Sequence, residues 1–119
     1  MPTGPHYAPA VRSGDLIFTS GQLPIIDPKT KALADGIEAQ TKLVLTKVEQ
    51  ILESYGLTKE HIIKTTAYIT DVAYWGVVNE VYAEFFGKYK PARTILPVAH
   101  LHYGCLIELE AIASFTRPS

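Results

Sequence analysis

The chain has 119 residues, with eleven Lys and Arg against twelve Asp and Glu and a net charge of -1 at pH 7. A chain of this length predicts a single domain over residues 1–119 that buries only about 60–70% of its unfolded surface, so association between copies would add stability. The charged residues form no basic cluster, which argues against nucleic acid as a partner.

The first ten residues contain no charged segment followed by an apolar one, and no apolar run approaches the length of a membrane span. The single cysteine, Cys105, excludes an internal disulfide and a cysteine-built metal site. We therefore expect a soluble, cytoplasmic protein whose partners are small molecules and other copies of itself, without a membrane or a nucleic acid.

The first half of the chain predicts one strand and one helix. Residues 16–20 are rich in β-branched and aromatic side chains and end at Gly21, which is typical of a strand followed by a turn. Residues 24–31 have the composition of a loop. Asp35 offers an N-cap, Glu38 follows three residues later, and apolar residues then recur at helical spacing as far as Gly56.

The second half predicts a strand, a helix and two further strands. Residues 62–70 alternate with a period of two, Asp71 offers a cap for a helix whose apolar stripe ends before Gly87, and residues 92–98 and 103–115 are extended. A turn at residues 100–104 joins the last two strands. This order of elements indicates one α+β domain with two helices on one face of a sheet.

The last strand has one apolar face and one mixed face. Alternation places Leu106, Glu108, Glu110 and Ile112 together, opposite a wholly apolar set that begins at Cys105. A buried carboxylate must be paired, hydrogen-bonded or neutralised, and Arg93 is the nearest candidate cation on an extended segment. We expect adjacent strands to bring Arg93 and Glu108 together as a ligand site, and the mixed face to pack against other copies of the chain.

Several motifs resemble the reactive intermediate deaminase family, also called Rid or YjgF. They are Tyr7 ahead of Thr19-Ser20-Gly21-Gln22, then Lys64-Thr65-Thr66, Pro91-Ala92-Arg93 and the IELEAIA run of residues 107–113. The resemblance implies a chorismate-mutase-like subunit with a mixed sheet, a homotrimer with a central β-barrel, and a site in each cleft between subunits. It also implies hydrolysis of enamine and imine intermediates, such as 2-aminoacrylate and 2-iminopropanoate, to 2-oxo acids and ammonia, without a cofactor.

The resemblance also implies roles for individual residues. Arg93 matches the arginine that holds the substrate carboxylate, Glu108 matches the acid that positions water, and Tyr7 and Ser20 match residues that line the same cleft. Ile95 replaces a cysteine that is common in the family, which we expect to make the pocket more apolar. The turn at residues 100–104 also departs from the family's usual Leu-Pro-Lys.

Alternative readings of these residues remain open. Arg93 and Glu108 could form an interfacial ion pair, Tyr7 could anchor the N-terminus, and Ser20 could cap a turn; Glu110 is better read as a structural partner. His100 and His102 point the same way on an extended segment, but two histidines are too few for a metal site, and a surface turn is the simpler reading.

Two other functions also remain open. One is a non-catalytic trimer that binds small carboxylates in the same clefts or acts as a stress-related holdase. The other is a pericyclic enzyme, which the chorismate-mutase-like fold alone suggests.

Overall fold

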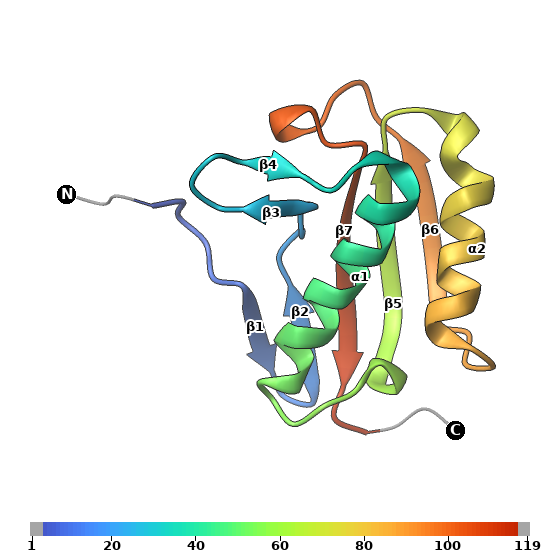
Figure 1. The fold of residues 1–119 in the computed structure, drawn as a ribbon. Helices are drawn as coiled ribbons and strands as arrows, with labels where there is room; N and C mark the ends of the chain where they lie inside the picture. Colours follow the sequence, from blue (N-terminus) through green and yellow to red (C-terminus); the bar gives the residue numbers. More distant parts are fainter. Residues whose placement is uncertain (1–3, 117–119) are drawn as a thin grey trace.

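The structure is a computed structural model, and it describes residues 4–116; residues 1–3 and 117–119 of the expected domain lie outside the described part. A five-stranded mixed sheet forms the body of the molecule, in the order β1-β2-β7-β5-β6 (Figure 1). These strands are β1 (Ala10–Ser13), β2 (Leu16–Thr19), β5 (Ile62–Ile69), β6 (Ala92–Pro97) and β7 (Ile107–Ser114). Strands β5 and β6 are parallel, and the other pairs are antiparallel.

Two helices, α1 (Gly36–Glu53) and α2 (Trp75–Phe86), pack on one face of this sheet (Figure 1). Three short 3-10 turns, η1 (Lys59–His61), η2 (Val72–Tyr74) and η3 (His102–Gly104), connect the larger elements. The predicted α+β fold is therefore confirmed, including both helices and the four predicted strands. The last strand begins at Ile107 rather than at residue 103, because η3 occupies the turn before it.

Strand β1 and a separate two-stranded sheet were not predicted. Strand β1 pairs with β2 through a tight turn at Gly14, and the segment predicted to be a loop contains a small hairpin of β3 (Ile25–Asp27) and β4 (Ala32–Leu33). Both consist of strands of only two to four residues. Such short strands carry too few alternations for a period of two to be recognised.

The helix starts differ from the prediction in detail. Asp35 occupies the N-cap position of α1, but its side chain accepts no capping hydrogen bond, and Glu38 instead forms an ion pair with Lys42 at 3.3 Å. Asp71 caps the short turn η2, where its Oδ1 accepts a hydrogen bond from the Ala73 N–H at 2.9 Å, and α2 begins later, at Trp75. Gly87 ends α2 as predicted, with a φ of 63°.

The core lies between the helices and one face of β5 and β7. The side chains of Ile107, Leu109 and Ala113 are fully buried there, packed with fully buried residues of α1 such as Leu45 and Val48. On the opposite face, Glu108, Glu110 and Ile112 are only half-buried, and both helices lie on the other side (Figure 1). The predicted division of β7 into an apolar face and a mixed face is thus confirmed.

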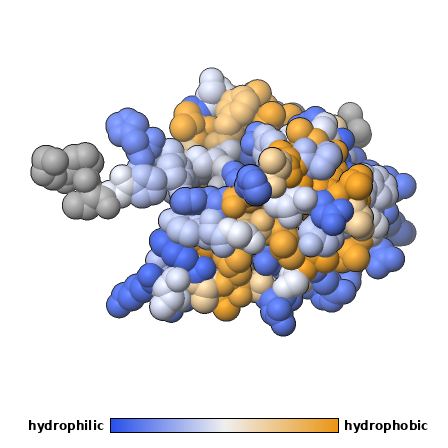
Figure 2. Space-filling model, turned by 90° about the horizontal axis from the view of Figure 1, so that it is seen from above, coloured by the Kyte–Doolittle hydropathy of each residue, from blue (hydrophilic) through white to orange (hydrophobic). Residues whose placement is uncertain are grey.

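The surface shows hydrophobic residues in several places between charged ones (Figure 2). Among the larger apolar side chains, Val11 and Phe18 of the first two strands are 58% and 42% exposed. None of the helices within residues 4–116 is long and apolar enough to cross a membrane.

Candidate functional site

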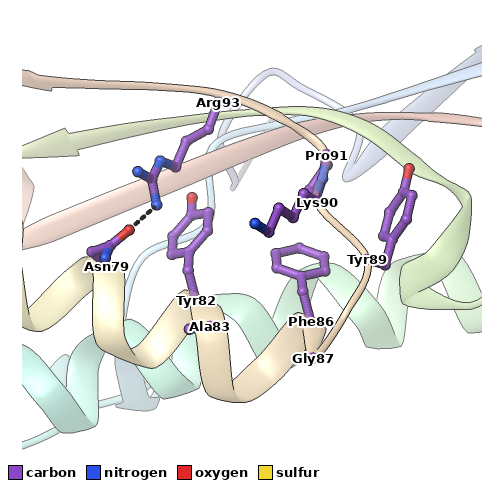
Figure 3. Close-up of a pocket in the computed structure, with 9 residues that line it drawn as sticks. All are labelled: Asn79, Tyr82, Ala83, Phe86, Gly87, Tyr89, Lys90, Pro91 and Arg93. Carbon is purple, nitrogen blue, oxygen red and sulfur yellow. Dashed lines mark hydrogen bonds between the residues drawn. The ribbon is translucent and has the colours of Figure 1, made fainter.

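Two hollows are lined by most of the site residues that the sequence predicted. The first, here called the Glu108 cleft, has a volume of about 480 Å³, and its lining includes Tyr7, Ser20 and Glu108. The second, here called the Arg93 pocket, has a volume of about 290 Å³ and lies between α2 and the start of β6 (Figure 3). The structure therefore brings three of the predicted residues together and places Arg93 elsewhere.

Glu108 lies against the backbone of Gly21. A Cβ atom added to Gly21 would stand 2.0 Å from Oε2 of Glu108, far inside van der Waals contact. The two segments are fixed to one another by a pair of backbone hydrogen bonds between Gln22 and Leu109, of 2.7 and 3.1 Å. The carboxylate can hold this position only because residue 21 has no side chain, since a Cβ there would force the end of the Glu108 side chain to move. The φ of Gly21 is not in the left-handed region.

The Glu108 carboxylate has no hydrogen-bond or ion-pair partner within residues 4–116. Burial raises the pKa of Glu108 above its ordinary value of 4.5, and the nearby charge of Glu110 raises it further, while His102 acts in the opposite direction. Glu110 differs, because its Oε1 accepts a hydrogen bond from the Tyr68 hydroxyl at 2.9 Å. Glu108 is therefore the acid of this pair that is open to a ligand or to water.

Ser20 and Tyr7 belong to one local arrangement. The Ser20 hydroxyl donates a hydrogen bond to the Ala8 carbonyl at 2.6 Å, and the Ser20 N–H donates to the Pro9 carbonyl at 2.9 Å. Ser20 thus tethers the segment that carries Tyr7 into the wall of the cleft. Tyr7 itself remains 62% exposed, so its ring is only partly covered by the rest of the chain and is a weak anchor for the N-terminus.

A hydrogen bond and contacts with two aromatic rings hold the Arg93 side chain of β6 against α2. Its Nη1 donates a hydrogen bond to Oδ1 of Asn79 at 2.9 Å, and its guanidinium carbon lies 5.1 Å from the ring centre of Tyr82 (Figure 3). The same carbon lies 5.2 Å from the ring centre of Trp75. The Tyr82 hydroxyl donates a hydrogen bond to Oγ1 of Thr65 at 3.1 Å, and burial raises the pKa of Tyr82 to about 12. Arg93 makes no ion pair with a carboxylate of residues 4–116.

The prediction that adjacent strands bring Arg93 and Glu108 together is wrong for the single chain. Strand β5 separates β6 from β7, and the two side chains are on opposite faces of the sheet. In the strand register, Arg93 of β6 lies opposite Thr65 of β5, on the helix-covered face. Glu108 of β7 lies opposite Tyr68 of β5, on the other face. The alternation of β7 was read correctly, but the sequence does not show which strand lies between the two residues.

In the strand register, Ile95 of β6 lies opposite Ala67 of β5, on the same face of the sheet as Arg93. Its half-buried side chain packs against the hydrophobic core and is not part of the lining of either hollow. Its expected effect on a pocket stays a prediction.

The predicted turn at residues 100–104 contributes to the Glu108 cleft. Tyr103 has a φ of 61°, its ring centre lies 3.7 Å from that of His102, and the Lys31 ammonium lies 5.6 Å from the Tyr103 ring. All three residues are in the lining of the cleft, whereas His100 is an exposed residue outside it. Residues 4–116 contain no group of three or more His, Cys, Asp or Glu that could hold a metal ion.

The sequence reasoning missed the residues that position the two functional side chains. The sequence identified Gly21 only as the end of a strand. The close approach of Glu108 from β7 to Gly21 leaves no signal in the residues around Gly21. Asn79 does leave one: Trp75, Asn79 and Tyr82 follow helical spacing of four and three residues, so they share the face of α2 on which Arg93 rests.

Comparison with known proteins gives consistent results. A family model described as endoribonuclease L-PSP matches residues 1–115. A RutC family protein of Pyrococcus horikoshii is 45% identical over 113 residues, covering 94% of this chain and 88% of the relative. The 2-iminobutanoate/2-iminopropanoate deaminase of Salmonella typhimurium is 41% identical over 110 residues, covering 90% and 85% respectively.

Two solved structures are similar to this chain in both fold and sequence. The crystal structure of Escherichia coli TdcF with bound serine has a TM-score of 0.86 and 36% identity, covering 97% of this chain and 91% of that one. The Escherichia coli YjgF gene product has a TM-score of 0.86 and 37% identity, with the same coverage.

Proposed function

The chain belongs to the endoribonuclease L-PSP family, which includes the Rid deaminases, and from this we propose that it is a hydrolytic deaminase of small 2-imino acids such as 2-iminopropanoate. One observation carries the proposal: an unpartnered carboxylate with a raised pKa, that of Glu108, stands in a cleft against a glycine that makes room for it. The name of the Salmonella relative supports the reaction.

The complete site is proposed to form between copies of the chain. The Glu108 cleft and Arg93 are on opposite faces of one sheet, and β6 is its edge strand. No helix within residues 4–116 covers the face that carries Glu108. A homotrimer in which this face packs against other copies would cover it and could set Arg93 of one copy opposite Glu108 of the next. The exposed ring of Tyr7 would then close the cleft.

The chemistry assigned to these residues is the addition of water to an imine. The Arg93 guanidinium pairs with the substrate carboxylate through two parallel hydrogen bonds, as its planar fork allows. Glu108 takes a proton from water as the oxygen attacks the imine carbon and passes it to nitrogen, which gives a carbinolamine. The same carboxylate then takes the proton of the new hydroxyl group and passes it to the amino nitrogen as the carbon–nitrogen bond breaks. The products are a 2-oxo acid and ammonia, and the carboxyl group ends in its starting state. A raised pKa suits a group that must accept and then release a proton.

A second candidate is a trimer that binds small carboxylates without catalysis. The specific observation in its favour is that the TdcF relative was crystallised with serine, an amino acid rather than an imine. The family description names RNA cleavage, but a net charge of -1 without a basic cluster does not favour a polyanion.

The test is a coupled assay in which a dehydratase releases 2-aminoacrylate from serine and the formation of the 2-oxo acid is timed. The chain should accelerate this step over the spontaneous rate, and Glu108→Gln should not. Serine binding by both variants without acceleration by either would favour the second candidate. A stable monomer of about 13 kDa in light scattering would contradict a site formed between copies.

A further inference from the structure

The Arg93 pocket contains a second cation that the proposed reaction does not use. We propose that this pocket binds small dicarboxylates, with one carboxylate on Arg93 and the other on Lys90. The substrates of this class would be 2-imino acids with an acidic side chain. The inference rests on the proposed function only for the reaction, because dicarboxylate binding requires no catalysis.

The charges in the pocket are unbalanced. Its lining contains Arg93 and Lys90 but no Asp or Glu: Asn79, Tyr82, Ala83, Phe86, Gly87, Tyr89, Lys90, Pro91 and Arg93. Neither cation has an ion-pair partner within residues 4–116. In Figure 3 both side chains extend from the β6 side over the rings of α2. Two unpaired positive charges facing one small volume repel each other, and a ligand with two negative charges removes that repulsion.

The remaining polar groups of the pocket are already engaged. The Tyr82 hydroxyl is hydrogen-bonded to Thr65, the Tyr89 hydroxyl donates to the Ile62 carbonyl, and Asn79 Oδ1 accepts from Arg93. The Arg93 guanidinium uses one of its five N–H donors in that contact, and the Lys90 ammonium has no hydrogen-bond partner among the described residues. The pocket therefore offers mainly N–H donors, which match acidic acceptors.

Local structure restrains the second cation. Gly87, with its φ of 63°, turns the chain back over α2, and Pro91 restricts the backbone of Lys90 to extended conformations. The floor between the two cations consists of the rings of Tyr82 and Phe86, whose centres are 5.8 Å apart. This floor suits the methylene groups between two carboxylates. The volume of about 290 Å³ is at the lower end of the roughly 300–1,000 Å³ of ligand pockets, so the ligand is small.

The test is calorimetric binding of three probes to the full chain. 2-Oxoglutarate is a five-carbon dicarboxylate, 2-oxovalerate has the same carbon chain with one carboxylate, and inorganic phosphate is a compact dianion. The variants are Lys90→Gln and, as the matched control, Lys88→Gln, which removes an equal charge from an exposed residue outside the lining. Thermal melting verifies that each variant is folded.

We expect the parent to bind 2-oxoglutarate about tenfold more tightly than 2-oxovalerate, the effect of one charge-assisted hydrogen bond. Lys90→Gln should remove this preference and leave 2-oxovalerate binding unchanged, while Lys88→Gln keeps the preference. Equal binding of the two oxo acids by the parent would overturn the proposal. So would an equal loss in both lysine variants, or phosphate binding as tight as that of 2-oxoglutarate, because each would show a general charge effect.

These results are independent of catalysis, since no imine is present. A chain that hydrolyses neither 2-aminoacrylate nor a glutamate-derived imine but prefers 2-oxoglutarate would refute the proposed function and keep the dicarboxylate pocket. The opposite outcome would refute the pocket alone.

Discussion

Replacing Gly21 by alanine tests whether the position of the Glu108 carboxylate matters for the reaction. The added Cβ would be 2.0 Å from Oε2, 2.9 Å from Cδ and 3.2 Å from Cγ of Glu108. The backbone of Gly21 is not in the left-handed region, so alanine brings no strain of its own. The substitution therefore acts mainly on the carboxylate, which must move.

The size of the effect follows from these distances. To restore an ordinary contact of about 3.5 Å, the carboxylate oxygen must shift by roughly 1.5 Å from its present 2.0 Å. A misplacement of about 1 Å in an active site can cost about a hundredfold in rate. Stability should change little, because the loss of a glycine from the unfolded chain stabilises by about 0.4–1 kcal/mol and offsets part of the strain.

The measurement is the rate of imine hydrolysis by the parent, Gly21→Ala, Glu108→Gln and the double variant. We expect a fall of about a hundredfold for Gly21→Ala and little further loss in the double variant, because both changes act on one group. Gly76→Ala is the control: its added Cβ meets nothing within 4 Å, and its φ is not positive. Parental activity in a folded Gly21→Ala variant would refute the reasoning.

Substitutions at Arg93, Glu108 and Ile95 give separate tests. Arg93→Ala should abolish hydrolysis and Arg93→Lys recover little, since the lost charge-assisted pair is worth about 1.5–3 kcal/mol; a parental rate in the alanine variant would exclude the anchor role. Burial raises the pKa of Glu108 above its ordinary value of 4.5, so the folded chain keeps this proton to a higher pH than the unfolded chain does. The free energy of unfolding therefore falls as the pH rises from the ordinary pKa through the raised one. Urea titrations between pH 4 and 7 should show a smaller fall for Glu108→Gln, and identical curves would contradict this. Ile95→Cys should lower the rate on leucine-derived imines relative to serine-derived ones, because each buried methylene contributes about 0.8 kcal/mol; an unchanged ratio would limit Ile95 to packing in the core.

The long periodic segments of this fold were predictable from the sequence. Helix α1 and strands β5 and β7 have enough turns or alternations for their pattern to outweigh local composition. Strands β3 and β4 were not predictable, because Pro24, Pro28 and Lys31 give that segment the composition of a loop. Its pairing depends on tertiary contacts, including the Lys47 ammonium, which donates hydrogen bonds to the Leu23 and Ile25 carbonyls at 2.8 and 2.7 Å.

The chemistry of the site was more predictable than its assembly. Glu108 stood out because an acid on a half-buried strand needs an explanation, and the structure leaves its carboxylate unpartnered. Its relation to Arg93 could not be read from the sequence, since strand order decides it and β5 intervenes. The contact between Gly21 and Glu108 joins positions far apart in the chain, which no local pattern reveals.

The central place of β7 sets the order in which this domain can be completed during synthesis. Strands β2 and β5 both pair with β7 and not with each other, and α1 packs on it. Because β7 is made after every other element in Figure 1, the growing polypeptide holds two unjoined parts of a sheet until β7 leaves the ribosome. Until then the edges of β2 and β5 are open to other chains, so nascent copies are exposed to aggregation until β7 has paired with both strands.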